Sequence, residues 1–117
     1  MLPLPTEADL SFATTHRYDR IQYELLSDFA SRYIWWKSPQ EAIMYPERIL
    51  AQVMNLGTYE DLGRLLAIFT VEDLRPVVLY AEPGWFTDRS WAFWYVRFGL
   101  IPYGSFAPAL PTRITHE

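Results

Sequence analysis

Apolar residues recur at intervals of three and four along most of this chain, the spacing of one face of an α-helix. The longest such stripe predicts a helix from about residue 17 to residue 36 and comprises Tyr18, Ile21, Leu25, Leu26, Phe29 and Tyr33. Off that stripe lie three acidic residues that we expect to face water, namely Asp19, Glu24 and Asp28. With proline and glycine as boundaries, the same pattern predicts a brief turn at 39–43 and helices over 46–55, 59–68, 71–81 and 88–98.

Several helix starts are marked by capping residues, and one such phrase occurs twice. The two copies are Thr58-Tyr59-Glu60-Asp61-Leu62 and Thr70-Val71-Glu72-Asp73-Leu74. A Thr hydroxyl accepts a hydrogen bond from an unpaired N–H of the first turn, and acidic residues there complement the helix dipole. The phrase therefore predicts two short helices joined by a tight turn, with solvated acidic side chains. Ser38 and Thr87 mark two further starts.

Two glycines and one proline give specific predictions about where helices end or kink. Gly57 follows the 46–55 helix, where a left-handed C-cap residue belongs, and Gly99 closes the last helix. Pro76 falls inside the 71–81 helix, where it removes one hydrogen bond and introduces a kink. The apolar run after Pro76 could instead form a strand, but a single strand would have no pairing partner. We expect a helix there.

These elements predict an all-α fold, a single domain of about five helices over residues 15–99. Residues 1–14 are expected to form an N-terminal arm, because Pro3 and Pro5 oppose early helix, although Thr6 and Asp9 could cap a short turn. Residues 100–117 are proline-rich and show no apolar period, which predicts an extended or disordered C-terminal tail.

Composition narrows the class of protein. Half of the 117 residues are apolar and 17% are aromatic, which favours a folded core. The chain has no cysteine, no evident leader and no apolar run of bilayer-spanning length, so we expect a cytoplasmic protein that does not enter a membrane. The net charge is −4, with Lys37 the only lysine, and positive residues are interleaved with carboxylates. Nucleic acid is therefore an unlikely partner.

No constellation of catalytic, cofactor-binding or metal-ligating residues is evident. The two histidines, His16 and His116, lie near opposite ends of the chain, and neither has a partner at metal-ligand spacing. No G-x-S-x-G motif is present. We therefore expect a protein that is not an enzyme and that needs no metal or cofactor. A DNA-reading hairpin over 58–81 is the alternative, although its second helix would bring Glu72 and Asp73 toward a polyanion.

An aromatic concentration near the end of the chain supplies the candidate site. Four of its residues share one helical face and are expected in the core: Trp91, Trp94, Tyr95 and Phe98. Phe93 cannot share that face fully, and arginines flank it. Large aromatic residues with arginine are typical of protein-binding hot spots. The predicted partner-binding residues, for another protein or a second copy, are Trp85, Phe86, Arg89, Phe93 and Arg97.

Residues 32–99 also resemble a known family. The matching stretches, in order, are Tyr33 with Trp35-Trp36, then Tyr45-Pro46-Glu47-Arg48-Ile49-Leu50, Leu56-Gly57-Thr58, Leu62 with Leu65-Leu66, and Phe93-Trp94-Tyr95-Val96-Arg97-Phe98-Gly99. The order is similar to that of small bacterial and archaeal helical proteins of unknown function, often encoded beside nucleotidyltransferase-type abortive-infection toxins. The resemblance implies an interaction protein that acts as antitoxin or accessory partner of such a toxin, whereas the alternative, a DNA-binding transcriptional regulator, rests on the 58–81 hairpin. It implies no catalytic residues.

Overall fold

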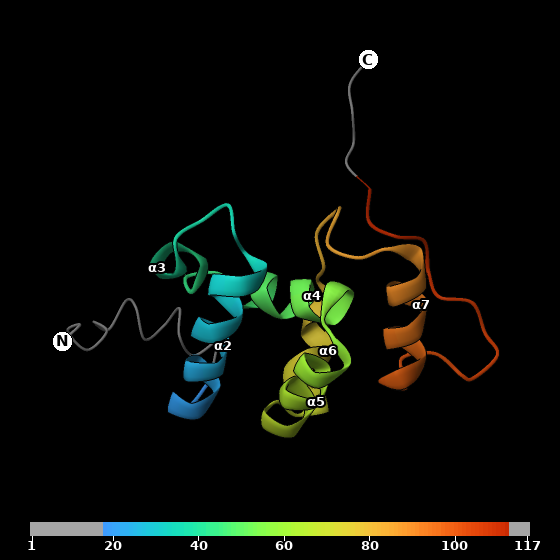
Figure 1. The fold of residues 1–117 in the computed structure, drawn as a ribbon. Coiled ribbons are helices and arrows are strands. Elements are labelled where there is room, and N and C mark those ends of the chain that lie inside the picture. The colour runs from blue at the N-terminus through green and yellow to red at the C-terminus, as the bar shows by residue number, and fades with distance from the viewer. Residues whose placement is uncertain (1–17, 113–117) are drawn as a thin grey trace, which may run out of the picture.

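The structure is a computed structural model that describes residues 18–112, and within them the chain forms six helices and no strand (Figure 1). The all-α prediction is confirmed. The helices are α2 (Arg20–Tyr33), α3 (Pro39–Ala42), α4 (Pro46–Leu56), α5 (Tyr59–Ile68), α6 (Val71–Leu79) and α7 (Asp88–Arg97). α3 forms where only a turn was predicted. The predicted arm over 1–14, including Thr6 and Asp9, and both histidines lie outside the described residues.

Helix α4 lies at the centre and packs against each of the other five helices (Figure 1). Its sequence explains this position, because apolar residues cover more than one face. Those that are almost fully buried are Ile49, Leu50, Ala51, Val53 and Met54. α2 lies on one side of α4 and α7 on the other. In the described part of the chain, no helix combines the length and the apolar character needed to cross a bilayer.

The predicted caps form, and one that was not predicted sets the start of α2. Asp19 accepts from the backbone N–H of Gln22, whose side chain accepts in return, a capping box that delays the helix to Arg20. Ile21, expected in the buried stripe, is 62% exposed, and Gln22 is buried in its place. The predicted side-chain caps are present at Ser38, Thr58, Thr70 and Thr87.

The structure confirms the predicted positions of Pro76 and Gly99 and corrects the predicted conformation of Gly57. Pro76 lies inside α6, as expected. Gly99 has a φ of 67° and ends α7 in a Schellman arrangement, with the N–H of Leu100 bonded to the Tyr95 carbonyl. Gly57 is not left-handed, since its φ is −63°. A side chain at Gly57 would instead overlap the carbonyl oxygen of Val53, so close approach, rather than φ, requires glycine there.

The aromatic face of α7 joins the core as predicted and is fixed by two indole hydrogen bonds. Trp94 Nε1 donates to the Met54 carbonyl of α4 at 3.0 Å, and Trp91 Nε1 donates to the Pro108 carbonyl at 2.7 Å. Residues 100–112 contain neither helix nor strand. Trp91 therefore attaches this segment to the helical domain at Pro108.

The two aspartates of the doubled phrase, Asp61 and Asp73, form hydrogen bonds with α2. The expectation that Asp61 is solvated is therefore wrong. Asp61 is 3% exposed and accepts hydrogen bonds from Nη1 and Nη2 of Arg32, at 2.8 and 2.9 Å, and from the Tyr33 hydroxyl at 2.5 Å. Arg64 lies 3.3 Å from Asp61 and 3.1 Å from Asp28, which completes the network. These hydrogen bonds, the Arg32 pair first, hold the pKa of Asp61 well below its usual range.

Asp73 makes the corresponding attachment at the other end of α2. Its carboxylate accepts from the backbone N–H of Thr70 and, at 3.2 Å, from the buried amide of Gln22. The same amide nitrogen donates to the carbonyl of Ile68 at the end of α5. The two copies of the phrase thus contact α2 near its two ends.

Candidate functional site

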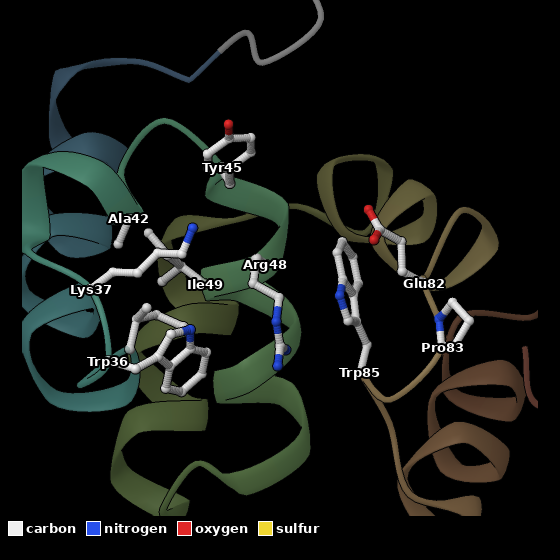
Figure 2. A pocket seen from close by; sticks show the side chains of 10 residues that line it. Trp36, Lys37, Ala42, Tyr45, Arg48, Ile49, Glu82, Pro83 and Trp85 are labelled. Atoms are coloured by element: carbon white, nitrogen blue, oxygen red, sulfur yellow. The ribbon is translucent and has the colours of Figure 1, made fainter. Parts of the chain in front are cut away.

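A surface pocket of about 350 Å³ lies where three connecting regions meet (Figure 2). One wall comes from the segment between α2 and α3, one from the start of α4, and one from the segment between α6 and α7. The lining residues are Ile34, Trp36, Lys37, Ala42, Tyr45, Arg48, Ile49, Glu82, Pro83 and Trp85. Aromatic, cationic and acidic side chains therefore surround one cavity.

Arg48 lies between two indole rings at the middle of this pocket (Figure 2). The central carbon of its guanidinium is 5.5 Å from the ring centre of Trp36 and 5.7 Å from that of Trp85, within cation–π range. One N–H donates to Gln52 Oε1 at 3.0 Å, from the next turn of α4. Burial lowers the pKa of Arg48 and nearby Glu82 partly opposes that change, yet a guanidinium remains charged at neutral pH.

The pocket carries more positive charge than its own carboxylate neutralises. Lys37, whose ammonium lies 5.2 Å from the ring centre of Tyr45, is the second cation, and Glu82 is the single acid of the lining. Neither Lys37 nor Arg48 forms an ion pair within residues 18–112, whereas Arg32 and Arg64 each bind carboxylates. Two cations of this pocket are thus available to an anionic group from outside.

Local sequence explains how these side chains converge. Ser38 caps α3 and turns the chain directly after Trp36 and Lys37. On the opposite wall, Gly84 has a φ of 88°, which glycine adopts without strain, and the N–H of Trp85 bonds back to the Glu82 carbonyl. The turn predisposes Trp85 to lie against Arg48.

The structure divides the predicted partner-binding residues among three environments. Trp85 lines the pocket, and Phe86 is buried with its ring 5.8 Å from that of Trp91. Arg89, Phe93 and Arg97 are exposed at intervals of four on α7, with Phe93 55% exposed. The predicted partner-binding residues did not include Trp36 or Arg48. The sequence signal for Trp36 was the unusual Trp35-Trp36 pair shortly after α2, and Arg48 had no comparable signal.

The described part of the chain gathers no ready set of metal ligands. Within residues 18–112, no three histidine, cysteine or acidic side chains lie close enough together to hold a metal ion. Comparison with protein-family models, with curated proteins and with solved structures gives no match. The fold and the pocket define a small helical domain with an aromatic and cationic surface pocket.

Proposed function

We propose that this protein is a non-enzymatic interaction protein that binds another protein through the Trp36–Arg48–Trp85 pocket. The observation that carries the proposal is the arginine held between two indoles, without an ion-pair partner among the described residues, in a pocket open to the surface. Tryptophan, tyrosine and arginine are the residues that dominate binding energy at protein interfaces. The pocket size suits an inserted side chain, since ligand pockets begin at roughly 300 Å³.

The restricted conformation of the Arg48 side chain supports this function. An exposed arginine loses roughly 2 kcal/mol of rotamer entropy when a partner fixes it. Here the two indoles and Gln52 restrict the guanidinium before any partner arrives. Binding then costs less ordering than at a free surface arginine such as Arg89.

The first partner to test is a nucleotidyltransferase-type toxin encoded beside this chain, because of the resemblance of residues 32–99. Co-expression with the neighbouring gene product, followed by size exclusion, measures complex formation. We expect a complex that Trp85→Ala abolishes and that Phe93→Ala, the matched exposed aromatic on α7, leaves intact. A monomer that ignores the neighbouring protein excludes the antitoxin role. Loss with Phe93→Ala but not with Trp85→Ala would move the binding surface to α7.

The DNA-binding alternative over residues 58–81 gains no support from the described contacts. α6 buries Leu74, Val77 and Val78 against the core. Of the basic residues on the hairpin, Arg64 binds Asp28 and Asp61, and Arg75 donates to the Phe98 carbonyl at 3.1 Å. A gel shift at low salt with the promoter of its own gene tests this alternative directly.

A further inference from the structure

We infer that the pocket receives a carboxylate side chain next to an aromatic residue, both in one segment of the partner protein. This inference rests on the proposed function and names the chemistry of the partner. The juxtaposition behind it is Arg48 between two indoles, with Lys37 and Tyr45 on the same rim (Figure 2).

An anion would complement the two cations of the pocket. Gln52 takes one of the five N–H donors of Arg48, and the described residues provide no other acceptor to that guanidinium. Its planar fork matches a carboxylate with two parallel hydrogen bonds. The indoles on both sides keep the fork from turning away, because rotation would break both cation–π contacts. Lys37 adds a second positive charge without competing for that geometry.

The charge of the surroundings favours a carboxylate over a phosphate. Glu82 lies on the rim, and the chain carries a net charge of −4. A phosphate monoester carries about −1.5 to −2 at neutral pH, so it meets more repulsion from Glu82 than a carboxylate with a single charge. Glu82 can in turn accept an N–H group from the backbone of a bound segment.

The walls favour an aromatic neighbour beside the carboxylate. Trp36 and Tyr45 are among the exposed large apolar residues, so ring surface remains open around the cations. An aromatic side chain beside the carboxylate buries that surface and stacks with offset or edge-on geometry. The pocket is lined by segments that are far apart in sequence, so a bound segment would contact several of them at once.

Capped dipeptides test this chemistry with the intact protein. Acetyl-Glu-Phe-amide is the probe, and acetyl-Gln-Phe-amide is the neutral control of the same shape. Acetyl-phosphoserine-Phe-amide and free 3-phenylpropionate represent the other anions. Two-dimensional NMR of the five tryptophan indole N–H signals reports the site of binding, because Trp36 and Trp85 line the pocket whereas Trp91 and Trp94 are buried.

We expect the Glu probe to shift the Trp36 and Trp85 signals. It should also bind about tenfold more tightly than the Gln probe, because a hydrogen bond to a charged group contributes about that much to affinity. Arg48→Gln should remove that difference, and Arg89→Gln, outside the pocket, should preserve it. Unchanged Trp91 and Trp94 signals confirm that Arg48→Gln folds. If they change, Lys37→Gln, at an exposed residue, serves instead and should weaken the Glu probe severalfold.

Three results would overturn the inference. Equal affinities for the Glu and Gln probes would show that the pocket does not select a carboxylate. Tighter binding of the phosphoserine probe than of the Glu probe would identify the preferred group as a phosphate. Tighter binding of 3-phenylpropionate would identify the ligand as a small free acid. The proposed function is judged separately by the effect of Trp85→Ala on the partner complex. Loss of that complex with no response to any acidic probe leaves the function standing and rejects only the inferred chemistry.

Discussion

Replacing Asp61 with asparagine tests whether the buried carboxylate fixes α2 against α5. The carboxylate accepts two guanidinium N–H groups from Arg32 and the hydroxyl of Tyr33, and it also lies near Arg64. Asparagine keeps the size and one acceptor oxygen but loses the negative charge. The Thr58 cap is retained, because it involves the backbone N–H of residue 61 rather than its side chain.

The structure sets the expected magnitude. A hydrogen bond to a charged group contributes about 1.5–3 kcal/mol, and breaking a fully buried ion pair costs about 3–5 kcal/mol. The side chains of Arg32 and Arg64 are 45% and 43% exposed, so water compensates part of their loss. We therefore expect Asp61→Asn to lower the free energy of unfolding by about 2–3 kcal/mol.

Asp28 provides a matched control, since it bonds the same two arginines but is 45% exposed. Asp28→Asn should cost less than about 1 kcal/mol, the range of surface ion pairs. Urea unfolding followed by circular dichroism at neutral pH measures both. A loss with Asp61→Asn no larger than with Asp28→Asn would refute the structural role of the buried carboxylate.

The pH dependence of stability tests the role of Asp61 independently. The pKa of Asp61 is lower in the folded state than in the unfolded chain, where it is about 3.9. Its contribution to stability is therefore complete above the unfolded pKa and is lost as the pH falls toward the folded value. The stability difference between wild type and Asp61→Asn should be constant from about pH 7 to pH 5 and shrink below about pH 4. A difference that grows in acid would contradict this.

Three further predictions concern the backbone and the segment after α7. Gly57→Ala should destabilise by about 1–3 kcal/mol in urea unfolding, because its Cβ meets the Val53 carbonyl. Gly63→Ala, in α5 with open space around it, should stabilise by about 0.5–1 kcal/mol, and a loss there would indicate a contact that the structure lacks. Trp91→Phe removes the bond to Pro108 and should speed proteolysis within 100–112 while α4 stays protected; equal cleavage rates would reject that attachment.

Local signals predicted the helix starts well, because a cap involves residues only three apart. Ser38, Thr70 and Thr87 each accept from the N–H three positions on, as their sequence context required. Gly99 likewise needs only its own left-handed φ. The prediction that Gly57 adopts a left-handed conformation was wrong because the constraint there is steric. No sequence pattern distinguishes overlap with the Val53 carbonyl from a need for positive φ.

The charged network and the pocket required tertiary information. Asp61 reads locally as a solvated first-turn acid, but Arg32 and Tyr33 reach it from nearly thirty residues away. Trp36, Arg48 and Trp85 come from three segments, and no single periodicity links them. The prediction included Trp85 because it considered aromatic density, and it did not include Arg48 because an arginine on an amphipathic helix ordinarily faces solvent.

The two attachments of α2 have a consequence for the pocket. Asp73 holds Gln22 near one end and Asp61 holds Arg32 at the other, so rotation of α2 about its axis or sliding along its neighbours would break at least one of these attachments. Trp36 follows the last residue of α2 by only three positions, so the position of that indole opposite Trp85 depends on contacts made outside the pocket. We therefore expect that release of Asp61 loosens the contact between Trp36 and Arg48, and by linkage that a ligand bound at Arg48 makes Asp61 harder to release.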